Sequence, residues 1–386
     1  MFKNTEIAFS LKTDSELERA YFLFKMINNQ PLVKIGTVAT NFALKAKLPV
    51  EGLIRATVFD HFCGGVNEDD CKPVVDKLFT KKVSSVLDYS VEGKETNEQF
   101  ESTANKTLDI ISFCKEKESL PFAVFKPTGL GRFALFEKVS KKEKLTAEED
   151  IEWQSVKVRF DNICSFAYNM NVPVLIDAEE SWMQDAADEL VLEMMMKYNK
   201  KRAVVFNTAQ MYRWDRLEYL KSIFEMAKTE NFYPGFKLVR GAYMEKENDR
   251  AKDLGYTSPI CKSKIETDKN FNEALIFLLE NLESCEIFIG SHNEESNLLA
   301  IDFMQKNHIS NKDHRIWFGQ LYGMSDHISF NLAHHDYQVA KYLPFGPVKD
   351  VMPYLIRRAE ENTSVAGQTS RELMLIKAER NRRETK

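Results

Sequence analysis

From residue 83 onward, the chain alternates between short apolar runs and longer segments with helical periodicity. Nearly continuous apolar runs are typical of parallel strands that are buried on both faces of a sheet. Eight such runs occur, most of them ending in polar residues, at 83–88, 122–126, 172–177, 203–207, 236–240, 287–291, 315–319 and 341–344. A strand followed by a helix, repeated eight times, predicts an α/β fold: a (β/α)8 barrel of the TIM type.

The segment before the first run has a different pattern. It shows helical periodicity without a strand rhythm, and a Gly64-Gly65 pair interrupts it. We therefore predict an N-terminal helical arm at 1–80, the barrel at 81–368 and a charged C-terminal helical tail at 369–386.

Polar side chains follow almost every predicted strand. In a (β/α)8 barrel, catalytic residues gather at the carboxyl ends of the strands. Here those ends carry Asp88, Lys126, Asp177, Gln210, Arg240, Tyr243, His292, Asn293, Gln320 and Tyr342. A single residue of this kind can equally be a helix N-cap, and Asp88 or Asn207 can be only that. As a set, these residues predict a polar, lined cavity.

Two adjacent arginines, Arg357 and Arg358, follow an apolar turn near the C-terminus. Neighbouring helix residues point about 100° apart, so both guanidiniums cannot lie on one polar face. One interpretation is a buried clamp for an anion, because the guanidinium fork matches a carboxylate. The other is a solvated basic patch near a helix C-terminus, where cations are favourable. The pair alone leaves both interpretations open.

The amino-acid composition limits the classes of function that this protein can have. The chain has 386 residues, of which 44% are hydrophobic and 29% charged, with a formal net charge of -5. These values are ordinary for a globular protein, and the acidic balance argues against a general nucleic-acid binder. No apolar run approaches the roughly 18 residues that a membrane-spanning helix needs.

Cysteine and histidine usage predicts reduced thiols and no metal site. The six cysteines are scattered without a CxxC pair, and the seven histidines form no HExxH motif. The N-terminal residues have neither an apolar signal core nor an arginine-rich leader. We therefore expect a cytoplasmic protein, with peripheral contact to the inner face of a membrane as a further expectation.

A glycine motif at 129–134 matches the GxGxxG/A pattern of dinucleotide-binding folds. A charged stretch at 137–144 follows it, where such a fold needs an amphipathic helix. The barrel rhythm also leaves no room for an open, doubly wound sheet. We therefore predict no Rossmann-type site here.

Several blocks in a fixed order resemble one family. From about Arg55 to Gly367 the chain resembles proline dehydrogenase, and it is more similar to the stand-alone, mitochondrial-type enzymes than to the fused bifunctional ones. The blocks are Lys126-Pro127-Thr128-Gly129-Leu130-Gly131-Arg132, Leu175-Ile176-Asp177-Ala178-Glu179-Glu180, Lys237-Leu238-Val239-Arg240-Gly241-Ala242-Tyr243, Gly290-Ser291-His292-Asn293-Glu294, Phe318-Gly319-Gln320-Leu321-Tyr322-Gly323-Met324 and 354–362.

The resemblance implies a flavoenzyme with FAD as its cofactor. Such an enzyme oxidises L-proline to 1-pyrroline-5-carboxylate by hydride transfer from proline C5 to flavin N5. It then passes the electrons to a membrane quinone, which implies transient peripheral contact with a membrane.

The resemblance also assigns residues to the substrate. Arg357 and Arg358 match the pair that grips the proline carboxylate, and Lys126 matches a lysine that adds positive charge beside it. Asp177 matches an acid in the same cavity. The other matches are Tyr342, Tyr354 and Leu321, which wall the ring, and Glu92, which matches an acid that pairs with the first arginine as a gate.

A second set matches the positions that hold the flavin. Gly241 and Ala242 are small enough for the cofactor to approach the backbone, and Lys237 stands where some members carry arginine. The set consists of Gln210, Lys237, Val239, Arg240, Gly241, Ala242, Tyr243, Lys262, Lys264, Ser291, His292, Asn293 and Glu361.

Three alternatives stay open from the sequence. One is a Schiff-base lyase on the same barrel, with Lys126, Lys237 or Lys341 as nucleophile. The second is an inactive flavin-binding barrel, and the third is a hydroxyproline dehydrogenase. Against the third, we expect Tyr342 to close the pocket and leave no room for a 4-hydroxyl group.

Overall fold

A computed structural model describes residues 1–29, 31, 36, 51–91, 93–364 and 368–385. Its strands form a closed barrel in the order β1 to β8, which confirms the predicted (β/α)8 fold. The strands are β1 Ser84–Tyr89, β2 Phe122–Phe125, β3 Val174–Ile176, β4 Val205–Gln210, β5 Gly235–Val239, β6 Glu286–Gly290, β7 Ile316–Leu321 and β8 Val339–Phe345.

Helices precede, connect and follow these strands. Before the barrel lie α1 Thr5–Ala8, α2 Asp14–Ile27, α4 Glu51–Ile54, the π-helix η1 Arg55–Phe59, α5 Asp60–Phe62 and α6 Glu68–Phe79. Between strands lie α7 Asn97–Cys114, the 3-10 turn η2 Pro127–Gly129, α8 Phe133–Ser140, α9 Ala147–Met170, α10 Ser181–Tyr198, α11 Arg216–Glu230, α12 Met244–Leu254, α13 Lys264–Glu280, α14 Glu294–Lys306 and α15 Asp326–His334. After β8 come α16 Met352–Ser364 and α17 Gln368–Glu384.

Every predicted apolar run overlaps a strand, but the boundaries shift by up to three residues, most clearly in the third and fourth strands. The third strand begins at Val174 instead of residue 172, since Pro173 has no N–H for the ladder. The fourth continues past Asn207 to Gln210, where it stays in register with Val239 of β5. The apolar pattern did not predict this extension, because the end of β4 contains polar residues.

Local signals set the helix ends. Thr96 and Thr146 close capping boxes at the starts of α7 and α9, so each threonine accepts a hydrogen bond from a backbone N–H. Asn171 and Asn231 adopt left-handed backbone conformations just after α9 and α11, as residues that stop helices commonly do. The strands are thereby separated by helices with defined limits.

The segment after the glycine motif is a helix, contrary to the sequence interpretation. The two-turn helix α8, Phe133–Ser140, begins within the glycine motif and includes the start of the charged stretch at 137–144, where no amphipathic helix was expected. Its buried residues Leu135 and Phe136 form an apolar face. The charged residues that follow them made this face hard to recognise in the sequence. The closed barrel still excludes an open Rossmann sheet.

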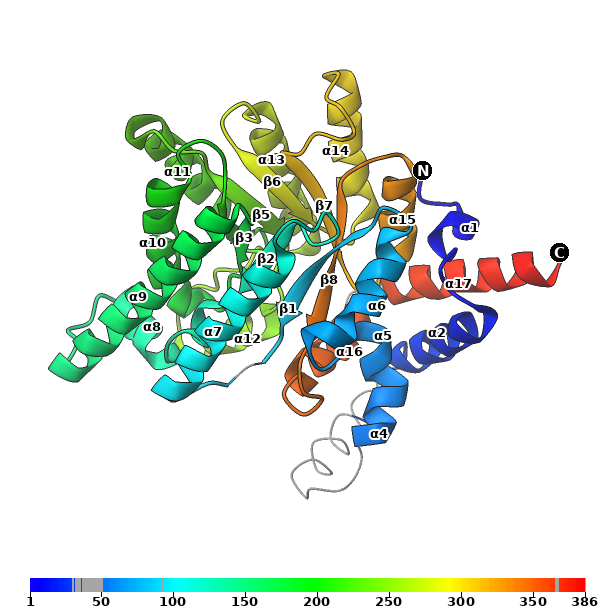
Figure 1. The fold of residues 1–386 in the computed structure, drawn as a ribbon, viewed down its shortest axis with the longest axis horizontal. Helices are drawn as coiled ribbons and strands as arrows, with labels where there is room; N and C mark the ends of the chain where they lie inside the picture. The colour runs from blue at the N-terminus through cyan, green and yellow to red at the C-terminus, as the bar shows by residue number, and fades with distance from the viewer. Residues whose placement is uncertain (30, 32–35, 37–50, 92, 365–367, 386) are drawn as a thin grey trace. The chain divides into compact units, whose positions relative to one another are not determined.

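The chain forms two compact units. The first comprises residues 1–92 and 320–386, and the second comprises 93–319. In the first unit, β1 pairs with β8 in parallel, with Val86 opposite Tyr342. Helix α17 lies alongside α2 in Figure 1, and Leu375 and Ile376 pack there against Phe24. The limits of arm, barrel and tail drawn from the sequence stay a prediction.

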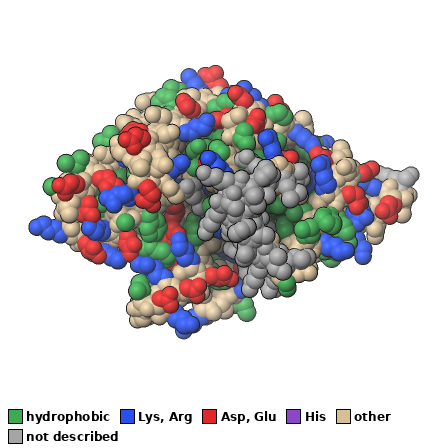
Figure 2. Space-filling view, turned by 90° about the horizontal axis from the view of Figure 1, so that it is seen from below, with side chains coloured by type: hydrophobic (Ala, Val, Ile, Leu, Met, Phe, Trp, Pro, Cys, Tyr) green, Lys and Arg blue, Asp and Glu red, His purple; other side chains and the backbone are tan. Residues whose placement is uncertain are grey.

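The surface carries charges of both signs. Figure 2 shows acidic and basic side chains interspersed over the face it presents, outside the grey residues. All six cysteines are free thiols, and burial raises the pKa of Cys114 and of Cys285 to about 12. Among the residues placed in the structure, none of the helices combines the length and apolarity that crossing a bilayer requires.

Candidate active site

A largely buried cluster of three charges lies at the strand ends of the second unit. Lys126 directly follows β2, Asp177 directly follows β3, and Lys237 belongs to β5. Lys126 Nζ lies 3.5 Å from Asp177 Oδ2, and Lys237 Nζ pairs with the other carboxylate oxygen. The structure thus brings together Lys126 and Asp177, which the sequence predicted for one cavity, and Lys237, which the resemblance assigned to the flavin.

The cluster places two lysines around one carboxylate. Burial by itself raises the pKa of Asp177, but the charges of Lys237 and Lys126 outweigh it and hold that pKa below its ordinary value. Asp177 is therefore ionised at neutral pH and interacts with both lysines. Lys237 is only 5% exposed, so its ion pair with Asp177 is shielded from water.

Arg240 lies just beyond β5 and is fixed by side chains of neighbouring elements. Its guanidinium bonds to Asp268 of α13 at 2.8 Å and to the hydroxyls of Ser291 and Ser296, each at 3.0 Å. It also stacks over the Phe271 ring, 4.4 Å from the centroid. Arg240 is thus a pre-oriented cation with a partly exposed side chain.

Sequence reasoning missed these partners of Arg240. Asp268, Phe271 and Ser296 lie within helical segments that look like ordinary amphipathic surface. The one available signal was the helical spacing of Lys264 and Asp268, which form an ion pair at 2.5 Å.

The rest of the predicted flavin set surrounds the same strand ends. Asn293 also serves as a helix cap, because its side chain accepts a hydrogen bond from Ser296 N–H at the start of α14. The set lies at or after the ends of β4, β5 and β6 and near the start of α13: Gln210, Val239, Gly241, Ala242, Tyr243, Lys262, Lys264, Ser291, His292 and Asn293.

Glycine is required at position 241. Its φ is +132°, a backbone conformation that side chains disfavour. A Cβ there would meet the ring of Tyr212 at 2.5 Å. The backbone after β5 therefore packs directly against the loop after β4, with no side chain between them.

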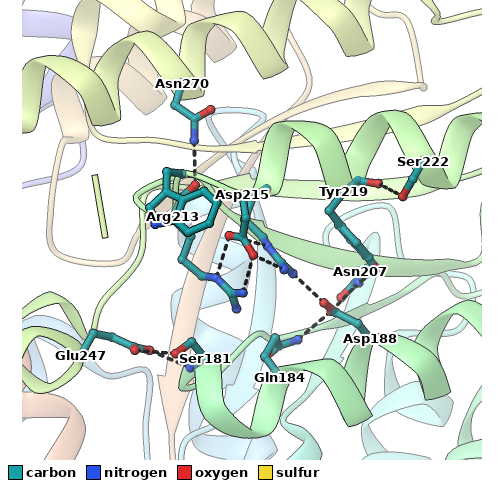
Figure 3. A network of polar contacts seen from close by, with 12 residues as sticks. Ser181, Gln184, Asp188, Asn207, Arg213, Asp215, Tyr219, Ser222, Glu247 and Asn270 are labelled. Carbon is teal, nitrogen blue, oxygen red and sulfur yellow. Dashed lines mark hydrogen bonds and ion pairs between the residues drawn. The ribbon is translucent and has the colours of Figure 1, made fainter. Parts of the chain in front are cut away.

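That loop is held by a buried polar network, shown in Figure 3. Asp215 receives two hydrogen bonds from Arg213, while the side chain of Asn270 donates to the backbone carbonyls of Met211 and Arg213, each at 2.8 Å. Asp188 of α10 pairs with Arg216 at 2.7 Å. The segment after Gln210 is thus fixed by charged and amide side chains on its outer side.

In the first unit, the arginine pair is not a solvated patch. Arg358 is 7% exposed, and its guanidinium carbon lies 5.2 Å from the centroid of the Tyr354 ring. Arg357, one residue earlier in α16, is partly buried. The burial of Arg358 argues against a solvated patch, and the anion clamp stays a prediction.

Two of the predicted ring-walling residues share one apolar cluster. Leu321 packs against the cluster that contains Tyr354, together with Met324 and Leu355. Tyr342 is buried within β8, and its carbonyl accepts a hydrogen bond from Tyr322 N–H at 2.8 Å. Glu92 lies outside the described residues, and the side chain of Glu361 is likewise outside them.

The sequence left open whether Asp88 and Asn207 are only helix N-caps. That interpretation is wrong for both residues. Asp88 lies in β1 and accepts a hydrogen bond from the Ser90 hydroxyl at 2.6 Å, while Thr96 caps the next helix. Asn207 lies within β4 and donates to Asp188 at 2.9 Å. Both belong to the buried polar interior.

A buried lysine supports the loop that carries Leu321. Lys341 is 0% exposed and donates to the carbonyls of Leu321, at 3.4 Å, and Met324. It pairs with Asp326 at 2.9 Å, and Asp326 also lies 3.3 Å from Lys12 of the N-terminal segment. Burial lowers the pKa of Lys341, whereas the two lysines hold the pKa of Asp326 well below its usual range.

Replacing Lys12 by methionine should lower the free energy of unfolding by about 1 kcal/mol, since the pair with Asp326 is partly exposed and Lys341 continues to neutralise the carboxylate. Urea denaturation of both proteins measures this difference. Lys3→Met, at an exposed position of the same segment, is the control. Equal losses in the two variants would mean that Lys12 does not anchor the segment.

A closed barrel with charged side chains at the carboxyl ends of its strands defines a TIM-barrel enzyme. The proline dehydrogenase family profile matches residues 71–371. The chain therefore belongs to the proline dehydrogenase family, and the family supports an oxidoreductase that acts on proline. Among the residues described, no cluster of His, Cys, Asp or Glu is suited to a metal ion.

Individual relatives agree with the family. The chain is similar to proline dehydrogenase 1, mitochondrial, of Arabidopsis thaliana, at 31% identity over 97% of this chain and 85% of the relative. It is 34% identical to the carbapenem antibiotics biosynthesis protein CarD of Pectobacterium carotovorum, over 86% of each chain.

A solved structure shares the fold. It is proline utilization A from Bdellovibrio bacteriovorus inactivated by N-propargylglycine, with a TM-score of 0.73 and 21% identity. The match covers 93% of this chain, and this chain spans 38% of that longer one.

Proposed function

We propose that this protein oxidises L-proline to 1-pyrroline-5-carboxylate, with FAD as cofactor and a quinone as final electron acceptor. The observation that carries the proposal is the Lys126–Asp177–Lys237 cluster, which lies inside the family match and places two lysines around one carboxylate at the strand ends. In the reaction, proline C5 loses a hydride and the ring nitrogen loses a proton. A C5=N double bond forms, and the substrate is oxidised by two electrons.

The donors at the ends of β4, β5 and β6 fit a flavin dinucleotide chemically. Lys237, Arg240 and Lys264 are cations suited to phosphate or to an electron-rich ring, and Gln210 and Asn293 supply amide groups. Gly241 offers backbone without a side chain. FAD, when bound, supplies the acceptor for the hydride that leaves proline.

The protein's own side chains bind and orient the substrate. Arg357 and Arg358 bind the proline carboxylate, and the burial of Arg358 strengthens each charge-assisted hydrogen bond by excluding water. Leu321 and Tyr354, which share one apolar cluster, pack against the pyrrolidine ring. Fixing the ring in this way raises the rate by orientation.

The lysines give little support to a Schiff-base lyase. Such a nucleophile must be a neutral amine, but Lys126 and Lys237 share the ionised Asp177. Lys341 donates to two carbonyls and pairs with Asp326, so its ammonium group is held by structural partners.

The proposed reaction is tested by incubating the purified protein with L-proline and a soluble quinone. Mass spectrometry should detect 1-pyrroline-5-carboxylate, and the quinone should be reduced. A parallel reaction with 4-hydroxyproline should be slower by about 100-fold, the discrimination expected from a pocket that excludes a hydroxyl by volume. Faster oxidation of 4-hydroxyproline would favour a hydroxyproline dehydrogenase instead.

Arg240→Ala should give a folded protein that retains less than about a tenth of the wild-type flavin. The reason is that a charge-assisted hydrogen bond contributes roughly 1.5–3 kcal/mol. Flavin absorbance per protein after gel filtration measures retention, and circular dichroism checks the fold. Arg202→Ala, which alters an arginine elsewhere in the same unit, is the matched control. Full flavin content in Arg240→Ala would contradict the role given to Arg240.

A further inference from the structure

A second carboxyl group lies two residues beyond Asp177 and clamps a neighbouring turn. Glu179 is 7% exposed, in the loop between β3 and α10. Its two oxygens accept hydrogen bonds from Thr128, one from the backbone N–H at 3.0 Å and one from the hydroxyl at 2.6 Å. Thr128 is the middle residue of the 3-10 turn that directly follows Lys126.

Hydrogen bonds also fix the backbone of Glu179. Its backbone N–H donates to the side-chain oxygen of Gln184 at 2.8 Å, and the Gln184 amide donates to Asp188 at 2.9 Å. Asp188 also accepts hydrogen bonds from Asn207 and Arg216, as part of the network in Figure 3. This continuous chain of hydrogen bonds gives the Glu179 loop little freedom to move away from Thr128.

The charges around Glu179 act in opposite directions. Burial has the largest effect and raises the pKa of Glu179 from its ordinary value of 4.5 to about 7. Glu180 acts in the same direction, while the Thr128 hydrogen bonds and the charge of Lys126 oppose it. Glu180 is itself paired with Lys246 of α12. The charge of Glu179 therefore changes near neutral pH.

We propose that Glu179 is a positioning residue: its carboxylate holds the Pro127–Gly129 turn through Thr128 and thereby orients Lys126 toward the anionic end of the substrate. This role rests on the function proposed above, because Lys126 needs a fixed orientation only if it faces a charged ligand. An ionised carboxylate accepts both hydrogen bonds from Thr128, whereas a protonated carboxyl has one oxygen occupied by its own hydrogen. Protonation therefore weakens the clamp, and acidic pH loosens the turn that follows Lys126.

The test compares kcat/KM for proline in the wild type and in Glu179→Gln between pH 5.5 and 9, a window about 1.5 units or more on each side of the expected transition. In the wild type, kcat/KM should show a transition near pH 7 in addition to the titration of the proline amine. Glu179→Gln should lack that transition and should lose about tenfold in kcat/KM at pH 8, the loss expected for one charge-assisted hydrogen bond. The loss should lie mainly in KM.

Thermal stability separates positioning from a purely structural role. Because the pKa of Glu179 is raised on folding, the folded state binds more protons between pH 4.5 and about 7, and stability falls as pH rises through that range. Above pH 7 the carboxylate is a buried charge that folding disfavours. Glu179→Gln should therefore have an equal or higher Tm than the wild type at pH 8, while its activity is lower. A purely structural carboxylate would show the opposite, a lower Tm with unchanged kcat/KM.

Three further variants keep the test decisive if Glu179→Gln folds poorly. Thr128→Val removes the hydroxyl and should reproduce the rise in KM, whereas Thr128→Ser keeps both hydrogen bonds and should restore wild-type KM. Glu180→Gln, which changes a neighbouring carboxyl that contacts Lys246, should retain the transition near pH 7.

The outcomes distinguish this inference from the function on which it rests. Wild-type protein that does not oxidise proline would overturn both proposals. An active wild type together with a Glu179→Gln variant that keeps the same KM and the same pH transition would overturn the role of Glu179 alone.

Discussion

Replacing Arg357 or Arg358 by methionine should raise the KM for proline at least about 30-fold and leave kcat within a few-fold of the wild type. Truncating one partner of a desolvated, charge-assisted pair costs about 2–5 kcal/mol, and 2 kcal/mol already corresponds to about 30-fold in affinity. Arg358 meets the condition of desolvation, being 7% exposed beside Tyr354. Steady-state kinetics over a range of proline concentrations measures the effect.

The control for this experiment is Arg55→Met in the same unit. The side chain of Arg55 is 51% exposed and 3.8 Å from Asp60, so its removal should leave KM unchanged. If Arg357→Met and Arg358→Met also leave KM unchanged, the carboxylate is bound elsewhere and the clamp is wrong.

Asp177→Asn should lower the free energy of unfolding by about 3–5 kcal/mol, the loss typical of removing one partner from a buried ion pair. Without the carboxylate, the ammonium groups of Lys126 and Lys237 lose the negative charge that they share. Urea denaturation followed by circular dichroism measures the change. Proline oxidation should fall as well, because both lysines lose the group that fixes them.

Two comparisons define what this second result means. The double variant Asp177→Asn/Lys237→Met should recover part of the lost stability, since it removes one of the two lysines that lose their shared carboxylate. Asp161→Asn, which breaks an exposed pair with Lys197, should cost less than about 1 kcal/mol. A loss in Asp177→Asn no larger than in Asp161→Asn would contradict the coupling of the three charges.

The strands were predictable because the signal is local. A run such as Phe122–Phe125 is apolar at every position, so one short window identifies a strand buried on both faces. Because Lys126 directly follows this run, it must lie at the end of the strand. Asp177 was found by the same reasoning, and the two meet as expected.

The supporting contacts were not predictable because they join distant segments. Thr128 and Glu179 are 51 residues apart, and no periodicity in either segment indicates that they meet. The charged tail is a further example. The sequence predicted a charged helix and did not indicate which of its residues are buried, yet Glu379 is fully buried and accepts hydrogen bonds from Arg382 and Arg383. Charge in a sequence indicates exposure only where no partner is present.

The anaerobic visible absorption spectrum of the purified protein tests the central claim most directly. The proposed function predicts the absorption bands of an oxidised flavin, which bleach when L-proline is added and return when a quinone follows. A flavin spectrum that proline does not change, or a protein without flavin absorption that also fails to bind added FAD, would contradict it.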